Sequence, residues 1–220
     1  MLNIIWDLDD TLIDSKKDIL FNIELALRDA FFDTVNLKKP LYVGPPIESI
    51  LKDVIPSEIL SNEKITEIVY HYRKHYDKSE FPTTVPFDGI EEIIYDTIHF
   101  NHYIVTNKSF SAAVRIIKKL GWEKNILILK SQPPNIEQRK TKTVNFFNLI
   151  NNIKSIKSFI LGIGDTKEDA IAAKNNDITS IGVLWGSGKK EELFNLCDYI
   201  FNNTKQLYDF LIEYNNAKIF

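Results

Sequence analysis

Polar side chains that could carry chemistry follow three short apolar stretches of the chain. The first stretch is followed by DLDDT from Asp7, the second by TNK from Thr106, and the third by GDTKED from Gly164. If the three stretches are neighbouring strands of a parallel sheet, their polar ends meet in one crevice. At least four carboxylates would converge there and repel one another, and a hard divalent cation such as Mg²⁺ relieves that repulsion.

The spacing of Asp7 and Asp9 suits a two-carboxylate reaction. Side chains two apart at the end of a strand point the same way, so both carboxylates can face one substrate. Aspartate is a competent nucleophile toward phosphorus, and a carboxylate near another carboxylate can retain a proton to donate. Thr106 and Asn107 offer uncharged donors to phosphoryl oxygens, and a lysine would offset the remaining negative charge.

The elements that must position these residues alternate between apolar runs and amphipathic helical patterns. This alternation predicts an α/β fold, with a doubly wound parallel sheet. We expect strands at 3–6, 103–106, 126–129, 159–163, 178–184 and 199–201. Among the helices between them, one begins near Asp88, one lies between Ser109 and Gly121, and one follows Thr204.

One region departs from this alternation of strand and helix patterns. Residues 15–82 show no convincing strand and instead carry three stripes of apolar residues at helical spacing. The first stripe follows Ser15 and Asp18, which form a capping-box pattern, and the second follows Pro46. We therefore predict an α/β catalytic core at 1–14 and 83–220, with a helical cap at 15–82 inserted after the first strand.

Composition narrows the class of protein. The chain has 220 residues, 44% of them hydrophobic and 26% charged, which is ordinary for a globular protein. A formal net charge of −3 gives no basic field for nucleic acid, and no apolar run is long enough to span a membrane. The single cysteine, Cys197, excludes a disulfide framework and favours a cytoplasmic location.

The ordered motifs resemble those of the haloacid dehalogenase-like superfamily. DLDDTL from Asp7 resembles its first motif, VTNK from Val105 its second, and GDTKED from Gly164 its fourth. The helical insert lies where this family places a cap domain on a Rossmann-like core. The segments GVLWG from Gly182 and VGPP from Val43 further resemble the phosphoglycolate-phosphatase-like branch.

This resemblance implies roles for the polar residues. Asp7 would be the nucleophile and Asp9 the general acid and base, while Thr106 and Asn107 would hold the phosphoryl group. It implies magnesium held by Asp7, by the Asp9 carbonyl and by two further carboxylates. Those two are Asp165 as a ligand and Asp169 in support.

The third-motif lysine has two candidates, Lys140 and Lys142. The family pattern places it about one helical turn before the first buried helix position, which favours Lys142 with Phe146. Asp10 departs from the pattern, because glycine is common there. Gly44 in the VGPP turn is our candidate for a cap tip that contacts substrate, because glycine permits close backbone approach.

We therefore expect a Mg²⁺-dependent phosphohydrolase that cleaves a small phosphorylated metabolite through an aspartyl-phosphate. The alternatives are a phosphomutase on the same scaffold and a catalytically silent binding protein that keeps the fold. The identity of the phosphomonoester and the oligomeric state cannot be read from the sequence.

Several residues also have simpler readings. Asp169 lies three residues after Thr166 and fits a capping box, and Thr106 with Asn107 could cap the next helix. Lys108 is expected to be solvated. The stretch GSGKK from Gly186 fails as a nucleotide-binding loop, because Lys190 replaces the required serine or threonine.

Overall fold

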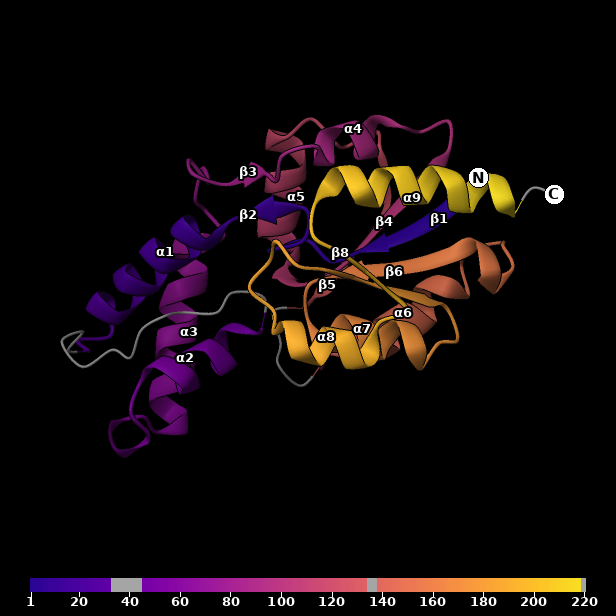
Figure 1. Ribbon diagram of the computed structural model, residues 1–220. Coiled ribbons are helices and arrows are strands. Elements are labelled where there is room, and N and C mark those ends of the chain that lie inside the picture. The colour runs from indigo at the N-terminus through magenta and orange to yellow at the C-terminus, as the bar shows by residue number, and fades with distance from the viewer. Residues whose placement is uncertain (33–44, 134–137, 219–220) are drawn as a thin grey trace.

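A six-stranded sheet forms the centre of the computed structural model, which describes residues 1–32, 45–133 and 138–218. The strand order is β5-β4-β1-β6-β7-β8, and every neighbouring pair is parallel (Figure 1). The strands are β1 (Leu2–Trp6), β4 (Phe100–Ser109), β5 (Ile126–Gln132), β6 (Ile160–Gly164), β7 (Thr179–Val183) and β8 (Tyr199–Phe201). All six predicted strands are present, so the predicted sheet is confirmed.

Helices cover both faces of this sheet. One face carries α4 (Ile90–Tyr95), α5 (Phe110–Lys119) and α9 (Thr204–Ala217), and the other carries α6 (Lys142–Ile150), α7 (Lys167–Lys174) and α8 (Lys190–Leu196) (Figure 1). Side chains of β1 alternate between the two faces. Ile4 and Trp6 belong to the core cluster that includes α4, α5 and α9, whereas Ile5 packs in a second cluster with Phe146 of α6. The doubly wound α/β prediction is confirmed.

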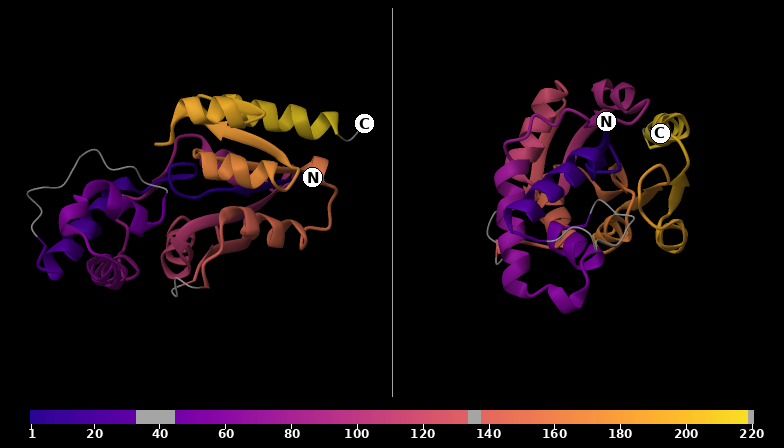
Figure 2. Two further views of the ribbon diagram at one scale, coloured as in Figure 1. Left: turned by 90° about the horizontal axis from the view of Figure 1, so that it is seen from below. Right: turned by 90° about the vertical axis from the view of Figure 1, so that its left-hand side faces the viewer.

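Three helices lie together at one end of the molecule, beyond the edge of the sheet where the motifs lie (Figures 1 and 2). They are α1 (Lys16–Asp29), α2 (Ile47–Val54) and α3 (Asn62–Tyr76). The chain enters them through β2 (Ile13–Asp14) and returns through β3 (Val85–Pro86), and these two short strands pair antiparallel. We call residues 15–82 the helical segment.

Helix starts follow the sequence signals in part. Ser109 caps α5 by accepting a hydrogen bond from the Ala112 backbone N–H, as expected. The expected capping box at Ser15 is wrong, because the Ser15 hydroxyl instead donates to Asp9. Gly89, rather than Asp88, occupies the N-cap of α4, where a φ of 77° favours glycine.

Asp18, the other half of that expected capping box, is buried. Its carboxylate accepts hydrogen bonds from the Thr83 backbone N–H and the Thr84 hydroxyl, at 3.1 and 2.6 Å. Asp18 therefore fastens the start of the helical segment to the chain that leaves it. Within the described ranges, no helix has both the length and the apolar composition to cross a membrane.

Candidate active site

The three polar segments meet because β1 lies between β4 and β6 in the sheet. Asp7 follows β1 directly, and its backbone N–H donates to the Ile163 carbonyl of β6 at 2.9 Å. The side chains of Asp7, Asp165 and Asp169 are all buried at this edge. The structure therefore brings together three of the four or more carboxylates that were expected to converge.

Asp7, Asp165 and Asp169 form a compact oxygen cluster. Each offers a carboxylate oxygen, and the three oxygens lie within 4.8 Å of one another. Asp7 Oδ2 is buried and has no hydrogen-bond partner in the part of the chain that the structure describes, and a bound ligand would satisfy it. A buried set of carboxylate oxygens with one unsatisfied member fits a hard divalent cation.

Burial and crowding disturb the ionisation of this cluster. Burial raises the pKa of Asp7 well above its ordinary value, and the negative charges of Asp169 and Asp165 raise it further against the opposing effect of Lys142. Burial likewise raises the pKa of Asp165 to about 7, with Asp169 and Asp10 adding to the shift. A cation bound here would relieve both effects.

Lys142, at the start of α6, supplies the positive charge. Its Nζ lies 2.8 Å from Asp7 Oδ1 and 2.7 Å from Asp169 Oδ1, and its side chain is buried. Burial alone would lower the pKa of Lys142, but Asp169 and Asp7 raise it above its ordinary value. Lys140 is exposed, and only its backbone carbonyl takes part nearby, accepting from Gln132 Nε2. Of the two candidate lysines, Lys142 is the one beside Asp7.

Asp9 belongs to a separate group of contacts on the side of the helical segment. Lys108 Nζ lies 2.9 Å from Asp9 Oδ1 and 2.5 Å from the Tyr76 hydroxyl of α3. The Ser15 hydroxyl, just before α1, also donates to Asp9. The expectation that Lys108 is solvated is therefore wrong, because its side chain is buried against Asp9 and Tyr76.

Thr106 and Asn107 lie near the end of β4, the strand that pairs with β1. Thr106 is buried, and its hydroxyl accepts from the Lys108 backbone N–H at 3.1 Å. Asn107 Oδ1 accepts from Gln132 Nε2 at 3.1 Å. Neither residue caps α5, since Ser109 does, so the simpler capping interpretation is wrong.

Asp169 makes two kinds of contact at once. Its Oδ2 accepts from the Thr166 backbone N–H at 3.2 Å and from the Thr166 hydroxyl at 2.5 Å, which completes the capping box of α7. Its Oδ1 faces Lys142. The capping interpretation is thus confirmed. Capping uses only Oδ2, so Oδ1 can take part in the carboxylate cluster.

The loop after β7 is a part of the site that sequence reasoning missed. The backbone N–H groups of Ser187 and Gly188 donate to Asp165 Oδ2 at 3.0 and 3.1 Å. A Cβ at Gly188 would collide with the Asp165 backbone carbonyl, so glycine is needed there for close approach. The sequence signal that could have identified this loop is the glycine-rich stretch from Gly186, which follows β7, the strand next to β6.

The Asp10-Thr11 turn contacts Asp165 and the loop after β7. The Thr11 hydroxyl donates to Asp165 Oδ1 at 3.3 Å. Asp10 has a φ of 58°, a left-handed conformation that glycine adopts without steric cost. Its carboxylate accepts a hydrogen bond from the Ser187 hydroxyl, and burial raises the pKa of Asp10 to about 6.

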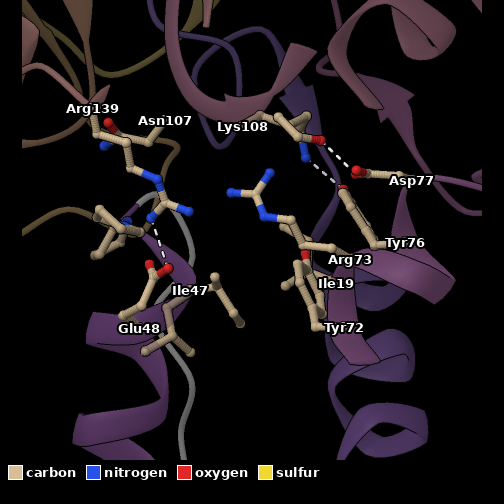
Figure 3. Close-up of a pocket in the computed structure, with 14 residues that line it drawn as sticks. Ile19, Ile47, Glu48, Tyr72, Arg73, Tyr76, Asp77, Asn107, Lys108 and Arg139 are labelled. Carbon is tan, nitrogen blue, oxygen red and sulfur yellow. Dashed lines mark hydrogen bonds and ion pairs between the residues drawn. The ribbon is translucent and has the colours of Figure 1, made fainter. Parts of the chain in front are cut away.

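A small cavity of about 50 Å³ lies between the helical segment and the end of the sheet (Figure 3). Asn107 and Lys108 line it from the core, and Tyr72, Arg73 and Tyr76 line it from α3. Pro45 and Pro46 reach its rim, whereas Gly44 lies outside the described residues. The cavity therefore adjoins the Asp9–Lys108 pair and is enclosed partly by the helical segment.

Comparisons with known proteins agree with this site. A family model described as haloacid dehalogenase-like hydrolase matches residues 4–183. A 5′-nucleotidase of Pseudomonas aeruginosa is 26% identical over 195 residues, which cover 87% of this chain and 86% of that protein. A phosphoglycolate phosphatase of Colwellia psychrerythraea is 22% identical over 200 residues, covering 86% and 87% respectively.

A solved structure shares the fold. It is a haloacid dehalogenase-like family hydrolase from Streptococcus pneumoniae, with a TM-score of 0.79 and 23% sequence identity. The match covers 96% of this chain and 98% of that one. The architecture around the carboxylate cluster is therefore one that a known hydrolase family uses.

Proposed function

The chain belongs to the haloacid dehalogenase-like hydrolase family, and we propose that it is a phosphatase of small phosphomonoesters that works through a phosphorylated Asp7. The observation that carries the proposal is the Asp7 carboxylate. Its Oδ2 is buried without a hydrogen-bond partner among the described residues, while its Oδ1 lies 2.8 Å from Lys142 Nζ. A fixed carboxylate with one unsatisfied oxygen is suited to attack phosphorus.

In the first step, an Asp7 oxygen forms a bond to phosphorus as the bond to the leaving oxygen breaks. Asp9 donates a proton to that leaving oxygen, so that an alcohol departs. In the second step, water attacks the phosphorus of the aspartyl-phosphate while Asp9 takes up the proton. The products are inorganic phosphate and the original Asp7 carboxylate.

The neighbouring residues have supporting roles in this proposal. Thr106 and Asn107 bind the phosphoryl oxygens, and Lys142 offsets the negative charge at the reacting centre. Lys108 and Ser15 orient the Asp9 carboxylate through the contacts described above. These residues come from three separate segments, so the fold must form before the site exists.

We propose magnesium as the cation of the carboxylate cluster. Asp7, Asp165 and the Asp9 backbone carbonyl would bind it, with Asp169 in support. When bound, Mg²⁺ would supply positive charge that screens the phosphoryl oxygens from Asp7. Asp165 is suited to this role because Thr11, Ser187 and Gly188 fix the orientation of its carboxylate.

The helical segment at 15–82 is proposed as a cap over a core formed by 1–14 and 83–220. Closure of such a cap excludes water while Asp7 is phosphorylated and encloses the leaving group. The small cavity beside Asp9 suits a small metabolite better than a macromolecule. Contact of Gly44 with substrate and a cytoplasmic location remain parts of the same proposal.

The test is release of inorganic phosphate from a panel of phosphomonoesters in the presence of Mg²⁺. We expect the wild-type protein to hydrolyse several small esters and Asp7→Asn to hydrolyse none. A protein that binds these esters without releasing phosphate would contradict the proposal. Formation of a phosphate isomer without net phosphate release would identify a mutase instead.

A further inference from the structure

Two arginine side chains face each other across the cavity beside Asp9 (Figure 3). Arg73 comes from α3 of the helical segment, and Arg139 comes from the core segment before α6. Arg73 Nε and Arg139 Nη2 are both buried, and among the described residues neither atom has a hydrogen-bond partner. Buried polar atoms in this condition are uncommon in native proteins, and a ligand is one way to satisfy them.

Nearby carboxylates do not neutralise Arg73. Asp77 Oδ1 accepts a hydrogen bond from the Ser109 hydroxyl at 2.5 Å, and Glu48 Oε1 pairs with Arg139 Nη1 at 2.7 Å. In the part of the chain that the structure describes, Arg73 makes no ion pair with either. Burial lowers the pKa of Arg73, and the positive charge of Arg139 lowers it further.

Lys108 is the third cation of the cavity, but its charge is already paired with the carboxylate of Asp9. Its Nζ lies 2.9 Å from Asp9 Oδ1. Lys108 and Asn107 line the cavity together with Arg73 and Arg139. The cavity is therefore adjacent to the residues on which the proposed phosphatase reaction depends.

We propose that Arg73 and Arg139 bind an anionic group on the leaving portion of the substrate, so that the preferred substrate carries a second negative charge close to its phosphoryl ester. The inference rests on the proposed phosphatase function and deepens it. A carboxylate or a second phosphate has the same charge and accepts hydrogen bonds from both guanidinium groups. A neutral leaving group of the same size leaves the buried nitrogens unsatisfied.

The cavity has room for such a group. Its volume of about 50 Å³ accommodates a short acidic group beside Arg73 and Arg139. The two guanidinium groups favour an ester whose anion lies close to the scissile oxygen.

The first test measures binding of compounds that cannot be hydrolysed. 3-Phosphonopropionate has a carboxylate tail, methylenediphosphonate has a second phosphoryl group, and propylphosphonate has a neutral tail of similar size. We expect the wild-type protein, studied by titration calorimetry with Mg²⁺, to bind at least one anionic-tail compound about 10- to 100-fold more tightly than propylphosphonate. Comparison of the two anionic compounds identifies whether a carboxylate or a phosphate is preferred.

Variants then assign this difference to Arg73. Arg73→Gln should remove most of the preference, and Arg73→Lys should restore part of it. Lys74→Gln is the matched control, because it removes the same charge from the next position of α3, where the side chain is exposed. Lys74→Gln should therefore retain the full preference, and thermal melts establish that each variant is folded.

Two outcomes would overturn the inference. One is equal wild-type affinity for anionic and neutral tails, and the other is an equal loss of affinity for both kinds of compound in Arg73→Gln. Binding that shows the expected preference in a protein that releases no phosphate would support the anion site while refuting the phosphatase. Hydrolysis of esters with no preference for a charged tail would support the phosphatase and refute the anion site.

Discussion

Lys108 Nζ lies 2.9 Å from Asp9 Oδ1, and both side chains are buried. The pair connects the loop after β1 with the end of β4, and the Tyr76 hydroxyl extends it into α3 at 2.5 Å from Lys108. A buried lysine with two such contacts fixes the carboxylate on which we place proton transfer. The helical segment therefore contributes directly to the position of Asp9.

Replacing Lys108 should impair turnover by freeing Asp9. Lys108→Met keeps the length and apolar stem of the side chain but removes its charge, and we expect kcat to fall by about 10- to 100-fold. Lys118→Met is the control, because Lys118 is an exposed residue of α5. Steady-state kinetics with one small ester would measure both variants, and an unchanged kcat in Lys108→Met would contradict the positioning role.

Replacements of the two candidate lysines, Lys140 before α6 and Lys142 at its start, should differ sharply in their effect on the rate. Lys142→Ala removes the cation 2.8 Å from Asp7 and should lower the rate by about 100-fold or more. Lys140→Ala changes an exposed side chain and should cost far less. The reverse ranking in a phosphate-release assay would transfer the role to Lys140.

Asp7 and Asp9 should separate when the leaving group is varied. Asp7→Asn removes the nucleophile, so no leaving group can restore turnover. Asp9→Asn removes the proton donor, and an ester of a strongly acidic phenol, which departs without protonation, should recover part of the phosphorylation rate. Rapid-mixing measurement of phenol release would show this difference, whereas equal rescue of both variants would refute the assignment.

Chelation should abolish hydrolysis, and added Mg²⁺ should restore it. The expectation follows from the cluster of Asp7, Asp165 and Asp169, because Lys142 offsets only one of its three negative charges. Ca²⁺ should restore little activity, because its looser coordination disturbs the in-line geometry of phosphoryl transfer. Full activity after dialysis against a chelator would exclude the metal-assisted reaction.

His102 should make the stability of the fold depend on pH. Its ring is fully buried in β4, where Nδ1 accepts a hydrogen bond from Trp6 Nε1 at 3.1 Å. Burial lowers the pKa of His102 to about 4, although the negative charge of Asp96 opposes the shift. The unfolded chain therefore binds a proton at this residue before the folded chain does, and stability is lost as the pH falls from about 6.5 toward 4.

The size of this effect can be isolated by substitution. Between about pH 8 and about pH 5, His102 should lower the free energy of unfolding by about 2 kcal/mol. Other groups titrate over the same range, so the measured quantity is the difference between wild type and His102→Asn in urea denaturation at both values. Asparagine keeps an acceptor for Trp6, and an unchanged pH dependence in this variant would contradict the prediction.

The positions of the strands were predictable because their local sequence determines them. Ile, Val and Leu runs bounded by polar residues gave all six strands of the sheet, and the capping role of Ser109 followed from its place before an apolar helical stripe. The convergence of Asp7 and Asp165 followed from a general property of parallel sheets. These inferences require only contacts near in sequence and one rule of topology.

The contacts of Lys108 and Ser15 could not be predicted in the same way. A lysine after a strand is ordinarily solvated, and its burial depends on Asp9 and Tyr76, both distant in the sequence. The same is true of Ser15, whose hydroxyl bonds Asp9 across the turn instead of capping its own helix. Both errors concern side chains with competing partners, where three-dimensional packing decides between them.

The alternation of β1 imposes a strict limit on how this sequence can evolve. Trp6 packs toward α4, α5 and α9, and Asp7, the next residue, contacts Lys142 of α6 on the opposite side. Exchange of Ile4 or Ile5 for another apolar residue preserves this arrangement. Insertion or deletion of a single residue reverses it, turning Asp7 away from Lys142 while the strand itself can still form. This segment can therefore change by substitution but not by insertion or deletion. The number of residues in the strand before Asp7 matters as much as their identity.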